Sequence, residues 1–179
     1  MIHFLKRELR PSIGRRGHLS IARIVVSALL LLLALLLIIT PYLEPAGTID
    51  FGEDGRANTI EHRATIDNMS NPVSRAVYLF GDWECHQHAS RSFFLHGNQM
   101  PVCARCTSIF LFIGLTAIFL MFYRVRMSMM LIMLLILPMA LDGGIQLITS
   151  YESTNILRFI TGALAGMASV LAFDTIFEM

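Results

Sequence analysis

Four long apolar runs, separated by polar stretches, dominate the pattern of the chain. The runs cover residues 21–43, 103–123, 128–149 and 155–177. Each has the roughly 20 residues that an α-helix needs to cross a hydrocarbon core about 30 Å thick. The last run contains the G-x-x-x-G pattern from Gly162 to Gly166, which suits close helix packing. The pattern predicts an all-α fold, a bundle of four transmembrane helices.

A cleavable signal peptide is the alternative for the first run, because basic residues precede it. The run is longer than the apolar region of a typical signal peptide, which has about 7–15 residues. The segment 40–45 that follows offers no small-residue cleavage site. We therefore expect residues 21–43 to form the first transmembrane helix.

Basic residues are unevenly distributed between the polar stretches. The N-terminal segment 1–20 has a single acid, Glu8, against the bases Lys6, Arg7, Arg10, Arg15 and Arg16. Arg124 and Arg126 directly follow the second run. The positive-inside rule places both groups in the cytoplasm. We expect a multi-pass protein of the cell membrane with its N-terminus and C-terminus in the cytoplasm.

The longest polar stretch, residues 44–102, is then an extracytoplasmic loop. Its first part, 44–69, is rich in glycine, aspartate and asparagine and has no apolar period, which predicts an exposed loop. An N-capping asparagine and a proline follow, and apolar residues then recur at helical spacing over about 72–84. We expect this short helix to lie in the membrane interface, with Tyr78 and Trp83 at the depth of the headgroups.

Composition agrees with this membrane class. Apolar residues make up 55% of the chain and charged residues 15%, and the apolar ones are gathered into runs. The net charge of +1 gives no support for nucleic-acid binding. Membrane lipid is the partner that the composition implies, and no protein partner is indicated.

All three cysteines lie in one polar segment near the outer end of the second run. Cys103 and Cys106 form a C-x-x-C, and Cys85 and His88 form a C-x-x-H, which is the paired spacing of a four-ligand zinc site. His86 adjoins Cys85 and would need a tighter bend to reach the same ion. We expect zinc to be bound by the three cysteines and one of His86 or His88.

A thiol-disulfide oxidoreductase is the competing hypothesis, in which Cys103 and Cys106 cycle and Cys85 exchanges with them. A C-x-x-C at a helix N-terminus suits this chemistry, because the helix dipole lowers the thiol pKa. In general architecture such a protein is similar to the vitamin K epoxide reductase group. An inert disulfide is a further alternative, although it would leave one cysteine over. The residues do not decide whether the protein is an enzyme.

Polar residues of the later runs fall at the same level as the cysteines. Asp142 and Gln146 lie near the outer end of the third run, and Asn155 and Arg158 begin the fourth. A carboxylate within a membrane span is costly and marks a functional position by default. We expect Asp142 and Arg158 to form an ion pair between these two helices.

Three arginines lie near the predicted metal site. Arg91, Arg105 and Arg158 all belong to the outer end of the predicted bundle. They could extend to lipid phosphates as ordinary interfacial arginines. Their convergence would also suit recognition of an anionic lipid headgroup or a phosphorylated lipid.

These motifs together resemble a known family. They are Cys85-His86-Gln87, Arg91-Ser92-Phe93, Pro101 through Thr107, Asp142 through Gln146, Ser153-Thr154-Asn155 and Leu157-Arg158. The combination is similar to small prokaryotic integral membrane proteins catalogued as domain of unknown function 2085, and covers about residues 75–170 of this chain. The family has a histidine at the position of His86, a glycine where this chain has Ser108, and more often a proline at Ala89. The resemblance favours His86 as the fourth ligand, brings no known activity, and implies that the outer-face residues carry the function.

Overall fold

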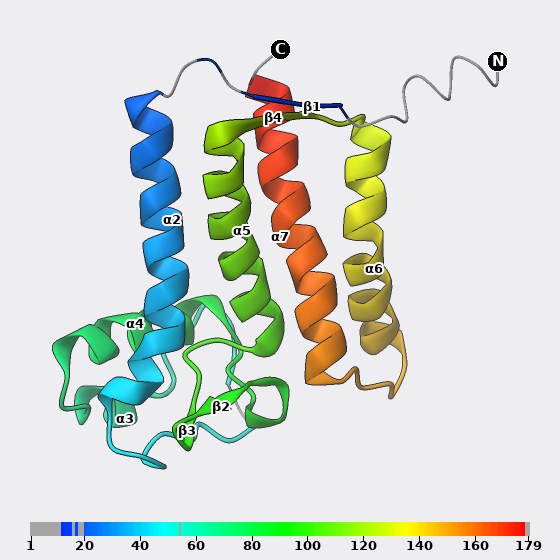
Figure 1. Cartoon of the computed structure of the whole chain (residues 1–179). Helices are drawn as coiled ribbons and strands as arrows, with labels where there is room; N and C mark the ends of the chain where they lie inside the picture. The colour runs from blue at the N-terminus through cyan, green and yellow to red at the C-terminus, as the bar shows by residue number, and fades with distance from the viewer. Residues whose placement is uncertain (1–11, 16, 18–19, 54, 178–179) are drawn as a thin grey trace.

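The computed structural model describes residues 12–15, 17, 20–53 and 55–177 (Figure 1). Its four long helices are α2 (Ile21–Ile39), α5 (Ala104–Phe122), α6 (Met129–Ile148) and α7 (Asn155–Phe177). Each is long and apolar enough to cross a membrane, and the 3-10 turn η1 (Thr40–Leu43) extends the first span. The expected fold of four apolar helices is therefore confirmed. The predicted basic segment 1–20 lies mostly outside the described residues.

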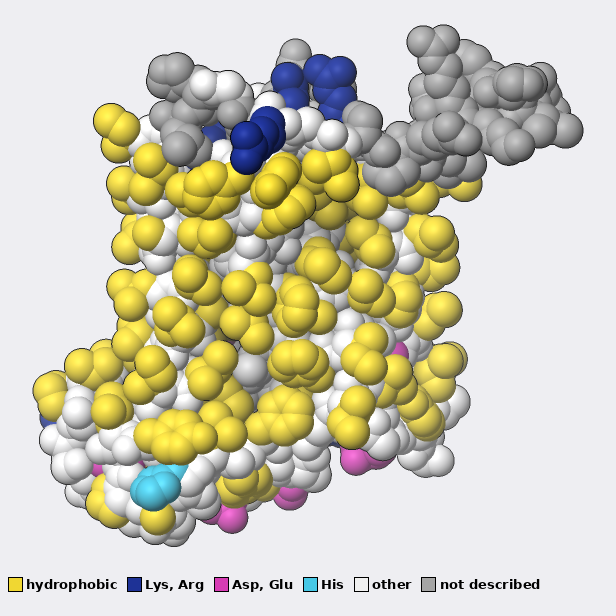
Figure 2. Space-filling view, viewed as in Figure 1, with side chains coloured by type: hydrophobic (Ala, Val, Ile, Leu, Met, Phe, Trp, Pro, Cys, Tyr) yellow, Lys and Arg dark blue, Asp and Glu magenta, His cyan; other side chains and the backbone are white. Residues whose placement is uncertain are grey.

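The four helices pack side by side in the order α2, α5, α7, α6 (Figure 1). The contact between the two middle helices, α5 and α7, is the most extensive one in the row. Hydrophobic side chains cover the visible face of the row along most of its length (Figure 2). A continuous apolar surface of this size is costly in water and is matched by lipid chains.

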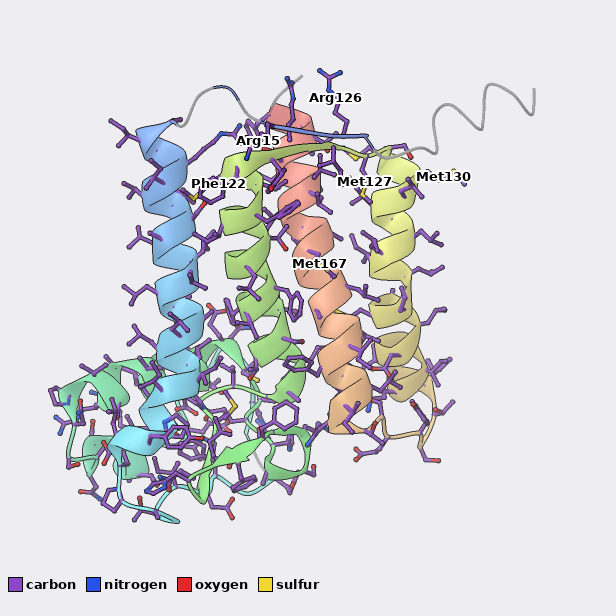
Figure 3. The ribbon with its side chains drawn as sticks, viewed as in Figure 1. Arg15, Phe122, Arg126, Met127, Met130 and Met167 are labelled. Atoms are coloured by element: carbon purple, nitrogen blue, oxygen red, sulfur yellow. The ribbon has the colours of Figure 1, made fainter. Side chains whose placement is uncertain are left out.

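The two ends of the row differ in charge and in structure. At one end, which we call the basic end, strand β1 (Ser12–Arg15) pairs antiparallel with β4 (Tyr123–Arg126). Arg15 lies there near the end of α5, opposite Tyr123, and Arg126 lies there three residues before the start of α6 (Figure 3). The other end carries residues 44–102, which we call the loop unit.

The loop unit is folded around an apolar core of its own, so the expectation of an exposed loop over 44–69 was wrong in part. Ile49, Phe51, Ile66, Met69 and Tyr78 are buried together. Around them lie α3 (Arg63–Asp67), α4 (Pro72–Glu84), the 3-10 turn η2 (Ala89–Arg91) and the hairpin of β2 (Phe94–Leu95) with β3 (Asn98–Gln99). These apolar residues are spaced irregularly along the chain, so no helix or strand period reveals them.

Helix α4 has the bounds that its sequence predicts. The side chain of Asn71 accepts a hydrogen bond from the N–H of Val73 at 2.8 Å, which caps the first turn. Tyr78 is fully buried and its hydroxyl donates to the carbonyl oxygen of Gln99 at 2.6 Å, so its expected position among headgroups was wrong. Trp83 is 49% exposed.

Glu44 connects the end of the first span to the start of α4. Its carboxylate accepts hydrogen bonds from the N–H groups of Ser70 and Asn71 at 3.1 and 3.0 Å. Burial raises the pKa of Glu44, but these hydrogen bonds outweigh burial and leave the pKa below its ordinary value. The ionised carboxylate therefore holds α4 against the end of α2.

Helices α5 and α7 approach closely at the G-x-x-x-G of α7. A Cβ added at Gly162 would lie 2.6 Å from the carbonyl oxygen of Arg105, and one at Gly166 would lie 2.6 Å from that of Ile109. Atoms do not approach this closely without a shift of the backbone. The two glycines therefore set the distance between the middle helices.

We predict that Gly166→Ala lowers the free energy of unfolding by about 1–3 kcal/mol, because the added methyl group overpacks the α5–α7 contact. Unfolding of the detergent-solubilised protein in a denaturant titration measures this. Gly144→Ala is the matched control, because a Cβ on Gly144 meets nothing within 4 Å. Equal stability of the two variants would contradict the close contact.

Candidate metal centre and the adjoining cavity

The three cysteines meet where the loop unit joins α5. Their Sγ atoms all lie within 4.8 Å of one another. Cys85 follows the last turn of α4, Cys103 is the N-cap of α5, and Cys106 lies in the first turn of α5. The N–H of Cys103 donates to Sγ of Cys85 at 3.2 Å. Cys85 is 3% exposed and packs in an apolar cluster with Leu37 and Val102.

Buried amide side chains bring the two cysteine segments together. Nε2 of Gln87 donates to the carbonyl oxygen of Pro101 at 2.6 Å, and Nε2 of Gln99 donates to the carbonyl oxygen of Gln87. Gly81 of α4 lies so close to Pro101 that a Cβ there would clash with its carbonyl oxygen. Gln87 has a φ of 47°, so the backbone directly after His86 adopts the left-handed conformation and changes direction there. These contacts join the chain leaving α4 to the chain entering α5.

A second amide pair holds the loop unit to the end of α2. Oδ1 of Asn98 accepts hydrogen bonds from the N–H groups of Thr48 and Ile49 at 2.8 and 3.0 Å, and its Nδ2 donates to the carbonyl oxygen of Pro41 at 2.8 Å. Oε1 of Gln99 accepts from the N–H of Phe51 at 2.8 Å. Sequence analysis missed these amides, because polar residues in a turn-rich segment carry no periodic signal.

The three cysteine side chains hydrogen-bond to one another. Hydrogen bonds from the thiols of Cys106 and Cys85 hold the pKa of Cys103 well below its ordinary value. The hydrogen bond to Cys103, together with burial, raises the pKa of Cys85 to about 11. The cluster therefore stabilises a thiolate on Cys103, at the N-terminus of α5, where the helix dipole favours negative charge.

A metal ion fits the donor set of this cluster. When a tetrahedral ion lies about 2.3 Å from each sulfur, the sulfurs are roughly 3.8 Å apart. This separation is compatible with the three Sγ atoms, which lie within 4.8 Å of one another. Thiolates are soft ligands and suit zinc among the common metals. Within the described parts of the chain, no histidine nitrogen joins the three sulfurs in a group of this size. His86 and His88 stack on each other with ring centroids 6.0 Å apart, and a fourth ligand from either stays a prediction.

A cavity of about 540 Å³ borders the cluster. Cys103 lines it together with His86, His88, Arg91, Arg105, Gln146 and Arg158. These residues come from the loop unit, from α5, from α6 and from α7. The structure thus brings most of the predicted polar residues around one space, and it places Asp142 and Asn155 in direct contact with two of the lining arginines.

Asp142 is buried and binds Arg105, so the expected ion pair between Asp142 and Arg158 was wrong. Nη2 of Arg105 donates to Oδ2 of Asp142. Arg158 instead donates from Nη1 to Oδ1 of Asn155 at 3.1 Å, and Nδ2 of Asn155 donates to the carbonyl oxygen of Ser92 at 3.1 Å. Hydropathy predicted at which end of the helices these residues lie, but it did not predict which neighbouring helix each side chain faces.

Gln146 lies between the two arginines. In one amide orientation its oxygen accepts from Nη2 of Arg105 at 3.3 Å. In the other, the oxygen accepts from Nη2 of Arg158 at 2.9 Å and from the N–H of Ser153 at 3.1 Å. The second orientation satisfies two donors at shorter distances, and we adopt it.

Arg91 lines the cavity and pairs with Glu152. Nη2 of Arg91 lies 2.6 Å from Oε1 of Glu152, and the two side chains are 40% and 59% exposed. This hydrogen bond lowers the pKa of Glu152. Glu53 makes a similar exposed contact, since it accepts from the N–H of Ser90 at 2.6 Å and lies 3.4 Å from Nδ1 of His88.

Four candidate membrane spans and a cluster of cysteines at one end of the row define a small membrane protein with a candidate metal centre. Residues 85–172 match the family described as predicted membrane protein (DUF2085), and the chain belongs to this family. The resemblance of the sequence motifs is thereby confirmed. The cysteine cluster and the arginines of the cavity all lie within the matched residues.

Two archaeal relatives support the assignment. The chain is 40% identical to the uncharacterized protein MJ1492 of Methanocaldococcus jannaschii over 111 residues, which are 59% of this chain and 70% of that protein. It is 39% identical to an uncharacterized protein of Methanothermobacter thermautotrophicus over 88 residues, which are 46% of this chain and 78% of that protein. No solved structure shows a significant match.

We predict that Arg105→Gln lowers the free energy of unfolding by roughly 3–5 kcal/mol, because it leaves the buried carboxylate of Asp142 without its partner. Asp142→Asn should cost less, because the Arg105 side chain that it leaves unpaired is 23% exposed. The double variant should lose much less than the sum of the two losses. Unfolding titrations of the solubilised protein measure this coupling. The matched control is Asp142→Asn combined with Arg158→Gln, for which we expect additive losses. Additive losses for the first pair would contradict the ion pair.

Proposed function

We propose that this membrane protein binds a zinc ion through Cys85, Cys103 and Cys106. The observation that carries the proposal is the approach of three sulfur atoms to within 4.8 Å of one another at the N-terminus of α5. The three cysteines are free thiols, so all three sulfurs are available as ligands. A zinc ion would tie the end of α4 to the start of α5.

Three sulfurs leave one position of a tetrahedral zinc ion to be filled. His86 and His88 both line the cavity that Cys103 borders, and a nitrogen from either imidazole in the fourth position would make a closed, structural site. A water molecule in that position would make an open site, of the kind that catalytic zinc uses. The number of protein ligands therefore separates a structural centre from an enzyme.

A thiol-disulfide oxidoreductase would use the same three sulfurs. The lowered pKa of Cys103 supports a thiolate, which both functions need. The two functions differ in what protects the thiols: a bound metal in one, and a disulfide in the other. We favour the metal, because the buried sulfur of Cys85 adds a third ligand, whereas a C-x-x-C redox pair needs only two sulfurs.

We predict about one equivalent of zinc per chain in protein purified with reductant, and a loss of most of it in Cys85→Ser, Cys103→Ser and Cys106→Ser, because each removes one of the thiolate ligands. Elemental analysis measures this. His86→Ala and His88→Ala identify the fourth ligand, and His96→Ala is the control, because His96 is exposed and stacks on Tyr42.

Thiol labelling separates the metal from the redox function in the same samples. If metal protects the thiols, a maleimide reacts with them only after a chelator is added. Less than about half an equivalent of any transition metal, with thiols that react once reductant alone is present, would exclude the zinc site and support the redox pair.

We also propose that the loop unit and the metal centre face away from the cytoplasm. The support is the position of Arg15, Arg124 and Arg126 at the opposite end of the row. A reporter enzyme that is active only outside the cytoplasm should be active when inserted after Asn58 and inactive when fused after Phe177. Activity from the second fusion alone would reverse the orientation.

A further inference from the structure

We propose that the cavity beside the cysteine cluster binds a phosphate-type oxyanion, held chiefly by Arg158 with Arg91 and Arg105. This inference goes beyond metal binding. It depends on the arginines and not on the ion, so each proposal can fail without the other.

The main support is the environment of Arg158. This side chain lines the cavity, yet the residue is only 3% exposed. A guanidinium stays charged under all ordinary conditions, and a buried charge is costly unless a counter-charge lies nearby. Its contacts are neutral amide oxygens, Oδ1 of Asn155 at 3.1 Å and the oxygen of Gln146 at 2.9 Å. Among the described residues, no carboxylate oxygen lies within 4.0 Å of it.

The other two arginines of the cavity are already paired. Arg105 binds Asp142, and Arg91 binds Glu152 at 2.6 Å. Two of the three arginines therefore have a paired carboxylate, and Arg158 has none of its own within the described parts of the chain. Glu152 and the sulfur of Cys103 also line the cavity and act on Arg158 electrostatically, but neither forms an ion pair with it. A buried cationic group without a paired carboxylate beside a cavity of about 540 Å³ is the arrangement expected of an anion site.

Spare hydrogen-bond donors lie in the same region. Nε of Arg105 and Oγ of Ser153 are buried and have no hydrogen-bond partner among the described atoms. The start of α7, at Asn155, adds the positive end of a helix dipole. A ligand with three or four oxygens arranged in space can use more of these donors together than a planar carboxylate with two oxygens or a halide can. This favours a phosphate group, whose tetrahedral oxygens match more than one guanidinium.

Two sources could supply that phosphate. Leu147 and Tyr151 line the cavity and are 87% and 42% exposed, so the cavity adjoins the apolar surface of the row as well as the polar loop unit. A lipid headgroup could enter from the membrane side. A free phosphate, or a soluble phosphate ester, could enter from the side of the loop unit. Both offer the same chemistry to the arginines.

The experiment uses the full-length protein in two arms. In the first, inorganic phosphate is titrated calorimetrically into delipidated protein in a neutral detergent. In the second, the protein is reconstituted in vesicles with equal amounts of phosphatidylcholine and phosphatidylglycerol, and the retained lipid is measured by native mass spectrometry. The variants are Arg158→Gln, Arg158→Lys and Arg91→Gln. Arg63→Gln is the control, because Arg63 forms an exposed pair with Asp67 in α3.

We expect Arg158→Gln to weaken binding of the effective probe at least about tenfold, which corresponds to 1.4 kcal/mol. Arg91→Gln should weaken it less, Arg158→Lys should not restore it fully because the planar fork is lost, and Arg63→Gln should bind as the wild type does. Binding in the first arm identifies a free phosphate, and selective retention of phosphatidylglycerol in the second alone identifies a headgroup. If Arg158→Gln does not fold, Arg91→Gln decides.

Metal content is measured in every sample, which keeps the two proposals apart. Wild-type protein that carries zinc but binds neither probe would overturn the anion site and leave the metal centre standing. Equal binding by the wild type, Arg158→Gln and Arg91→Gln would also overturn it. Anion binding without metal would instead contradict only the proposed metal centre.

Discussion

The meeting of the three sulfur atoms depends on buried amide groups that bind the main chain. Cys85 and Cys103 belong to different helices, and the chain between them makes a hairpin with little regular structure. The amides of Gln87 and Gln99 replace the missing ladder of backbone hydrogen bonds, since they bind carbonyl oxygens directly. An unsatisfied buried amide costs about 1–3 kcal/mol, so these contacts stabilise one conformation of the segment against its alternatives.

The first turn of α5 connects the segment that the buried amides hold to the rest of the row of helices. Cys103 and Cys106 turn toward the loop unit, while Arg105 between them binds Asp142 on α6. Gly162 on α7 lets α7 pack directly against this turn. One helical turn therefore contributes to the sulfur cluster, to the ion pair between Arg105 and Asp142, and to the contact between α5 and α7. Because the three interactions share this turn, we expect a change in one of them to shift the groups that form the other two.

Hydropathy and capping signals predicted the elements well, because they are local. The four apolar helices, the N-cap of α4 and the place of the C-x-x-C at the start of α5 all follow from short stretches of sequence. The rotation of each helix about its own axis, in contrast, depends on contacts with the other helices. Asp142 was placed at the right end of α6, but its partner depends on how α5, α6 and α7 pack, which one sequence does not reveal. The core of the loop unit was missed for a similar reason, because Ile49 and Tyr78 meet only after the chain has folded back.

The order of the residues along the chain has a consequence for assembly. Cys85, Cys103 and Cys106 all precede α6 and α7, and the amides that position them also lie in the first part of the chain. The cavity, in contrast, needs residues of α6 and α7 to close it. Since a membrane protein is synthesised and inserted from its N-terminus, the sulfur cluster has all its residues before the walls of the cavity exist. A nascent chain that ends before α6 already holds every cysteine, but it lacks Arg158, the one of the three cavity arginines that has no paired carboxylate among the described residues.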